Sequence, residues 1–164
     1  MSTSRVSPVE AARELWRERY AGARVIFLAG SVMRGEATPT SDLDIVVVFE
    51  ELADAYRETF TSGGWPVEAF VHDAGSLRHF YGVERKRGLP SLMRMVIEGV
   101  EVPEASEFSA GLKREATEAY AAGPPPFDAE ELRLRRYRLT DWIDDLSTGQ
   151  KFDNSSPLKT FSFA

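Results

Sequence analysis

The chain has 164 residues, 43% of them hydrophobic, and contains no cysteine. This length suits one folded domain, or a domain with a small appendage, and the lack of cysteine excludes disulfide frameworks, thiol nucleophiles and cysteine-based zinc sites. With 26 acidic and 20 basic residues, the formal net charge is -6. That charge disfavours a nucleic-acid partner, whose affinity depends largely on Lys and Arg. It suits a cationic small molecule better, although many ordinary cytoplasmic enzymes are as acidic.

The first residues form no apolar segment of the secretory type, and no apolar run is long enough to cross a bilayer. We therefore predict a cytoplasmic protein with no membrane partner.

The N-terminal region predicts a helix followed by a strand. Ser7-Pro8-Val9-Glu10 is typical of a helix start, because serine can cap, proline fits the first position and glutamate can complete a capping box. Apolar residues then recur at helical spacing up to Tyr20, and Gly22 ends the run. A buried strand is predicted at 24–28. It ends at Gly30-Ser31, which leads into a helical turn and a loop.

The middle of the chain contains the clearest strand, at 42–49, where a β-branched apolar centre follows two carboxylates. Residues 51–60 predict an amphipathic helix that Gly63-Gly64 ends, and residues 67–71 predict a third strand. The remainder has helical periodicity. The helices predicted there are 76–87, 91–98, 111–122 and 128–146.

A run of glycine and prolines at 123–126 predicts a semi-rigid break in the chain. We expect a core domain at 1–123, a helical appendage at 124–149 and an irregular tail at 150–164. The last helix has an apolar stripe, which predicts either a truncated helical domain or cover by another subunit. The stripe consists of Leu132, Leu139, Ile143 and Leu146.

The residues suited to chemistry lie between 28 and 49. A strand that ends in Gly30-Ser31 presents backbone N–H groups and a hydroxyl, which suit phosphate oxygens. Asp42 and Asp44 then lie two residues apart in a strand, so their carboxylates share one face. Two adjacent carboxylates repel each other unless a cation neutralises them, and Mg²⁺ prefers such oxygen ligands together with substrate phosphates. Glu68, the polar member of an apolar strand, is the candidate for a third carboxylate.

Each of these parts has an ordinary alternative. Gly-Ser pairs are common in loops, Asp-x-Asp is frequent at solvated strand ends, and Glu68 could be an exposed strand residue. Arg34 could contact phosphate or be solvent-exposed, and Arg94 and the charged run 84–87 are equally ambiguous. The order of the parts, rather than any one of them, favours phosphoryl or nucleotidyl transfer.

The stretch GSVMRGEATPTSDLDIVV resembles the signature of the DNA polymerase beta-like nucleotidyltransferase superfamily. It is similar to the version in bacterial aminoglycoside nucleotidyltransferases and in the minimal nucleotidyltransferases of toxin–antitoxin pairs. The motif covers about twenty residues, and the order of elements extends the resemblance over residues 24–71. Members that act on aminoglycosides have a substantial helical domain after the core, whereas here one helix follows the proline break.

The resemblance implies a small mixed β-sheet flanked by helices. Together with the helix predicted after the proline break, this gives an expected α+β fold with a short C-terminal helical appendage. By position, Gly30 and Ser31 would bind a nucleoside triphosphate, with Arg34 as a further candidate. Asp42 and Asp44 would hold two Mg²⁺ ions. Glu68 would complete the catalytic, metal-binding set.

The predicted function is magnesium-dependent transfer of a nucleoside monophosphate, AMP from ATP, to a hydroxyl of a small molecule such as an aminoglycoside. One alternative is an antitoxin-type enzyme that adenylylates a partner toxin, and another is a nucleotide-binding protein without catalysis.

Overall fold

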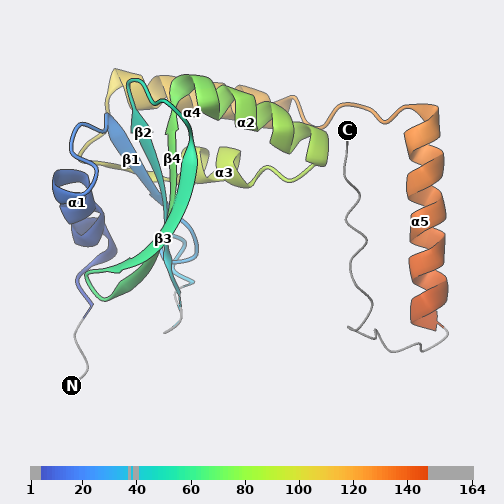
Figure 1. Cartoon of the computed structure of the whole chain (residues 1–164), viewed down its shortest axis with the longest axis horizontal. Helices are drawn as coiled ribbons and strands as arrows, with labels where there is room; N and C mark the ends of the chain where they lie inside the picture. Colours follow the sequence, from blue (N-terminus) through green and yellow to red (C-terminus); the bar gives the residue numbers. More distant parts are fainter. Residues whose placement is uncertain (1–4, 37, 39–40, 148–164) are drawn as a thin grey trace. The chain divides into compact units, whose positions relative to one another are not determined.

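The computed structural model describes residues 5–36, 38 and 41–147. The chain divides into two compact units, Met1–Pro125 and Pro126–Ala164. Among the described residues, the first unit contains a five-stranded sheet and four helices, and the second contains a single helix (Figure 1). The predicted α+β fold with a small mixed sheet is confirmed.

The sheet has the strand order β3-β4-β2-β1-β5. The central pair, β2 and β4, is parallel, and every other neighbouring pair is antiparallel. Strands β4, β2 and β1 are therefore hydrogen-bonded on both edges, whereas β3 and β5 are edge strands. The strands are β1 (Val25–Ala29), β2 (Leu43–Phe49), β3 (Tyr56–Ser62), β4 (Trp65–Asp73) and β5 (Val100–Val102).

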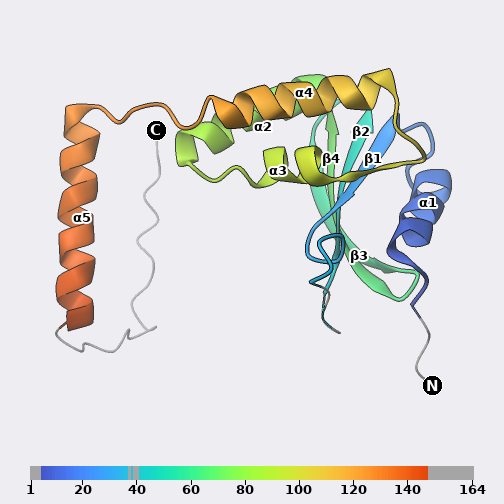
Figure 2. The same ribbon diagram turned by 180° about the vertical axis from the view of Figure 1, so that it is seen from behind.

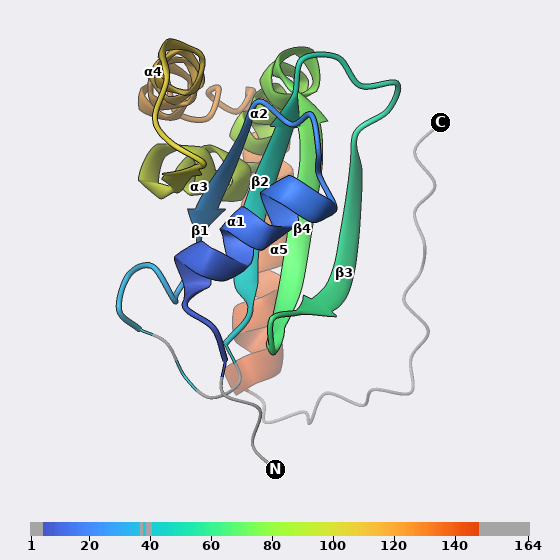
Figure 3. The same ribbon diagram turned by 90° about the vertical axis from the view of Figure 1, so that its left-hand side faces the viewer.

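Helices cover both faces of this sheet. One face packs against α1, and the other packs against α2, α3 and α4 (Figures 2 and 3). The helices of this unit are α1 (Pro8–Glu18), α2 (Ala74–Arg87), α3 (Ser91–Glu98) and α4 (Glu107–Ala121). Ser7 caps α1 as predicted, since its hydroxyl accepts a hydrogen bond from the Glu10 N–H at 3.3 Å.

Alternation along β2 builds two apolar clusters on opposite faces. Ile45 and Val47 point toward α1, whereas Val46 and Val48 point toward α2, α3 and α4. All four side chains are fully buried. Because the strand is covered on both faces, its sequence is an almost continuous apolar run.

The predicted helix at 51–60 is wrong, because residues 56–62 form the edge strand β3. Its alternating residues are half-buried and exposed, as in a strand with one covered face. Gly63 and Gly64 do not end a helix: both have positive φ and form the two-residue turn between β3 and β4. The apolar residues of this segment fit both the helical and the strand period. Pairing with β4 makes the segment a strand.

Two other differences are smaller. Strand β5 was not predicted, because three residues at a sheet edge provide no measurable period. Helix α4 begins at Glu107 rather than at residue 111, since Ser106 and Ser109 form a capping box at its start.

The second unit is described through α5 (Ala129–Ser147). Its apolar side chains are exposed, including all four members of the predicted stripe. The predicted irregular tail at 150–164 lies outside the described residues. Within the part of the chain that the structure describes, no helix is both long and apolar enough to span a membrane.

Candidate active site

Three carboxylates converge where β2 and β4 begin. The parallel register places Asp44 beside Glu68 on the neighbouring strand. Asp42 lies directly before the first residue of β2. One oxygen from each of the three side chains lies within 4.8 Å of the other two. The structure therefore brings together the three acidic residues that the sequence singled out.

Gly30 lies against this cluster at the end of β1. Its φ of +83° belongs to a region that side-chain-bearing residues rarely adopt. A Cβ atom at this position would lie 2.1 Å from the Asp44 Oδ2 atom. Only glycine allows the backbone to pass so close to the carboxylate, which explains its place in the motif.

The chain after Gly30 folds into a tight turn. The Met33 N–H donates to the Gly30 carbonyl at 3.2 Å, and the Glu36 N–H donates to the Ser31 carbonyl at 3.0 Å. The Ser31 hydroxyl donates to the hydroxyl of Ser41 at 3.4 Å. Ser31 is thus positioned beside the residue that precedes Asp42.

The electrostatics of the cluster favour a bound cation. Burial raises the pKa of Asp44, and the neighbouring charge of Asp42 raises it further. The positive charges of Arg34 and Arg57 oppose this rise. Taking the proton off Asp44 therefore costs free energy that a divalent cation at the three oxygens would offset. The donor set, three carboxylates, fits a hard cation such as Mg²⁺.

Glu68 has one oxygen in an unusual position. Its Oε1 atom is buried and accepts no well-aligned hydrogen bond. The neighbour of this atom is the guanidinium of Arg57, with which it forms an ion pair. Arg57 was missed by the sequence prediction because it was assigned to a helix. The strand-like alternation of 56–62 would have placed it beside β4.

These residues line a cleft with a volume of about 610 Å³. Four of the predicted site residues, Gly30, Arg34, Asp44 and Glu68, form part of its wall. Asp42 belongs to the carboxylate cluster and Ser31 belongs to the adjoining turn, but neither residue lines the cleft itself. The remaining wall consists of Ala29, Arg57, Phe70, Leu89, Pro90, Ser91, Arg94, Met95, Glu98 and Tyr120. A cleft of this size can hold a nucleotide.

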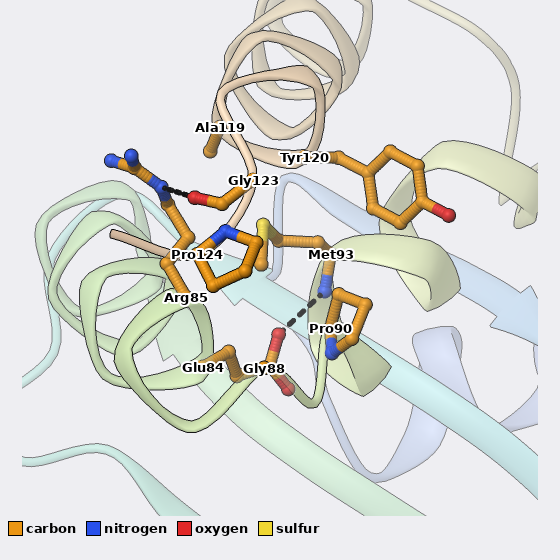
Figure 4. Close-up of a pocket in the computed structure, with 9 residues that line it drawn as sticks. All are labelled: Glu84, Arg85, Gly88, Pro90, Met93, Ala119, Tyr120, Gly123 and Pro124. Atoms are coloured by element: carbon orange, nitrogen blue, oxygen red, sulfur yellow. Dashed lines mark hydrogen bonds between the residues drawn. The ribbon is translucent and has the colours of Figure 1, made fainter. Parts of the chain in front are cut away.

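A second cavity, of about 280 Å³, shares Pro90 and Tyr120 with the cleft (Figure 4). Glu84 and Arg85 of the charged run line this cavity rather than the cleft. The Glu84 carboxylate accepts hydrogen bonds from the N–H groups of Leu92 at 2.6 Å and Met93 at 3.1 Å. The start of α3 is therefore capped by a side chain from α2.

Comparisons with known proteins gave a match to a family and a partial match to a solved structure. No curated protein matches the chain. Among solved structures, a nucleotidyltransferase-like protein from Exiguobacterium sibiricum is similar, with 16% identity and a TM-score of 0.49. The match covers 66% of this chain and 38% of that protein, so this chain spans well under half of the other's length. A model of the nucleotidyltransferase domain matches residues 9–90, half of the chain, and the chain belongs to that family.

Proposed function

We propose that the chain is a magnesium-dependent nucleotidyltransferase that transfers AMP from ATP to a hydroxyl of a small molecule such as an aminoglycoside. The observation that carries this proposal is the convergence of Asp42, Asp44 and Glu68 within 4.8 Å, beside the Gly30 turn and at the wall of a cleft. Membership of the nucleotidyltransferase domain family supports the same reaction class.

In this proposal Asp42, Asp44 and Glu68 hold two Mg²⁺ ions. Bound magnesium supplies positive charge that offsets the charge of the triphosphate and of the leaving pyrophosphate. The raised pKa of Asp44 and the buried Oε1 atom of Glu68 support a cation at this point.

The triphosphate binds along Gly30, Ser31 and Arg34. The absence of a side chain at Gly30 lets phosphate oxygens approach the backbone. Arg34 supplies positive charge at the wall of the cleft. The start of α3 also reaches the cleft, but Glu84 already accepts from two of its first N–H groups. Side-chain cations and the Gly30 turn are therefore the main phosphate contacts that we propose.

The chemistry is an in-line displacement. The acceptor hydroxyl oxygen forms a bond to the α-phosphorus while the bond from that phosphorus to the bridging β-phosphate oxygen breaks, which releases pyrophosphate. The hydroxyl proton passes to a carboxylate oxygen of Glu68, acting as the general base.

The choice of acceptor rests on the sequence. The likeness of GSVMRGEATPTSDLDIVV to small-substrate nucleotidyltransferases supports a small hydroxyl-bearing acceptor, and a net charge of -6 suits a cationic one. We also propose a cytoplasmic location, since no apolar run in the sequence is long enough to cross a bilayer. We also propose that residues 1–123 form the nucleotidyltransferase core and that residues 124–149 form a helical appendage.

The test is incubation with ATP, Mg²⁺ and a panel of aminoglycosides, read as pyrophosphate release and as a mass increase of one AMP on the acceptor. The Asp42→Asn/Asp44→Asn variant is the matched control. Transfer by the wild type alone supports the proposal. AMP attached to a protein in a cell lysate, with no small-molecule product, would favour the antitoxin-type alternative. Metal-dependent ATP binding without pyrophosphate from any acceptor would favour a non-catalytic binding protein.

A further inference from the structure

We propose that Arg57 occupies the place of the metal at Glu68 in the nucleotide-free protein and moves to the triphosphate when metal and nucleotide bind. This inference rests on the proposed function and concerns the regulation of that same site. It starts from an ion pair that joins Arg57 to a proposed metal ligand.

The ion pair is built by the sheet. Arg57 lies on β3 opposite Phe70, and the next-but-one residue of β3, Thr59, pairs with Glu68. The Arg57 guanidinium lies 5.2 Å from the centre of the Phe70 ring and reaches the Oε1 atom of Glu68. The fixed register of an edge strand thus delivers a positive charge to the carboxylate cluster.

The two ends of this ion pair differ in their environment. The Glu68 side chain is 18% exposed, whereas the Arg57 side chain is 63% exposed. Burial fixes the glutamate, while the arginine can leave with little loss of packing. Phe70 and Arg57 both line the cleft, so the guanidinium has a path from the carboxylate into the cleft.

A cation at the carboxylates and a guanidinium at Glu68 exclude each other. Both would use the Glu68 carboxylate. Like charges a few ångströms apart repel strongly where water is partly excluded. Arg57 therefore lowers the metal affinity of the empty site. The same charge raises nucleotide affinity once it is free to donate to phosphate oxygens.

The other cleft arginines are held differently. Arg94 and Arg34 lie near Glu98, at 2.8 Å and 3.8 Å from its carboxylate oxygens. Glu98 is outside the carboxylate cluster. Among the ion pairs of the described residues, the Arg57–Glu68 pair alone involves a member of that cluster. The exchange is therefore specific to Arg57.

The decisive measurement is Mn²⁺ binding to the nucleotide-free protein, followed by electron paramagnetic resonance of the free ion. We expect Arg57→Gln to bind Mn²⁺ at least about fivefold more tightly than the wild type, and Arg57→Lys to be intermediate. Arg78→Gln is the matched control, since Arg78 is equally exposed and pairs with Glu115 away from the cleft. We expect its Mn²⁺ affinity to equal that of the wild type.

The second measurement is binding of ATP with Mn²⁺ present, by calorimetry. We expect Arg57→Gln to bind ATP about fivefold more weakly, the opposite direction to its effect on the metal. Thermal unfolding of each variant checks that the fold is retained.

The outcomes separate the two proposals. If the wild type binds Mn²⁺ and Arg57→Gln has the same metal affinity, the exchange is refuted and the proposed function stands. A metal affinity that falls in Arg57→Gln also refutes it. If neither protein binds Mn²⁺, either alone or with ATP present, the proposed function fails, and the exchange fails with it.

Discussion

The two faces of strand β2 have opposite chemistry. Toward α1, Leu43, Ile45 and Val47 form a continuous buried apolar surface. Toward α2, α3 and α4, the apolar surface of Val46 and Val48 is continued at the start of the strand by a carboxylate, Asp44. One face serves stability alone, while the other combines stability with a concentration of negative charge.

This contrast indicates that Asp44, a residue suited to chemistry, lowers the stability of the folded protein. Burial and Asp42 raise the pKa of Asp44, so its ionised form is unfavourable in the folded state. Sites of this kind are commonly less stable than their neutral variants. We therefore expect substitution of Asp44 and substitution of a buried residue on the α1 face to have opposite effects on the free energy of unfolding.

The largest expected effect is on activity. Asp44→Asn should reduce nucleotidyl transfer at least about a thousandfold, because it removes a proposed metal ligand. The same change should raise the free energy of unfolding by about 0.5–2 kcal/mol, since it removes repulsion from Asp42. Pyrophosphate release and urea denaturation measure the two quantities. A lower free energy of unfolding for Asp44→Asn than for the wild type would contradict the statement that the Asp44 carboxylate destabilises the fold.

On the α1 face, Ile45→Ala should lower the free energy of unfolding by about 2–5 kcal/mol, because it leaves a cavity in a fully buried cluster. Metal affinity should be unchanged, since the side chain points away from the cleft. Urea denaturation and Mn²⁺ binding test both statements. Ile45→Val is the control, with an expected loss of about 0.5–1.5 kcal/mol.

Gly30→Ala should lower both the free energy of unfolding and the affinity for Mn²⁺. Its Cβ atom would clash with the Asp44 carboxylate, and its backbone conformation would be strained, so we expect a loss of about 1–3 kcal/mol and weaker Mn²⁺ binding. Gly22→Ala is the matched control: Gly22 has a φ of +95° but no atom within 4 Å of its Cβ position. Equal effects at both glycines on Mn²⁺ binding would show that the close approach to Asp44 has no role.

The smallest expected effect is pH-dependent and lies outside the site. Glu58 accepts hydrogen bonds from Arg19 at 3.2 Å and from the Tyr20 hydroxyl at 2.7 Å, which connects β3 to the segment after α1. The Arg19 hydrogen bond is the main reason why the pKa of Glu58 is lowered. The resulting stability is fully present above the ordinary glutamate pKa of about 4.3 and is lost as the pH falls through the lowered folded-state pKa.

Glu58→Gln should therefore be less stable than the wild type by about 0.5–1 kcal/mol at neutral pH, and the difference should shrink as the pH falls below 4. Thermal unfolding between about pH 3 and pH 7 measures it. A difference that stayed constant with pH would mean that the ionised carboxylate is not the stabilising form.

Most elements could be predicted because their local signals agree. The strand at 42–49 has a β-branched apolar run, and α1 has a serine cap followed by helical spacing. Residues 51–60 could not be assigned correctly, since their apolar positions fit two periods. Strand β3 forms because β4 offers an unpaired edge and Gly63-Gly64 permits the turn. That edge exists only in the folded sheet.

The sequence by itself determined the carboxylates and the glycine. Gly30, Asp42 and Asp44 lie at the ends of clearly apolar strands, and Glu68 is the acidic residue within an apolar strand. Only the tertiary structure decided what faces them. Arg57 comes from a strand whose existence depends on pairing, and Arg94 comes from a helix whose start is capped by Glu84. Carboxylates on neighbouring strands follow from local periodicity, whereas the arginines opposite them depend on contacts between segments distant in the chain.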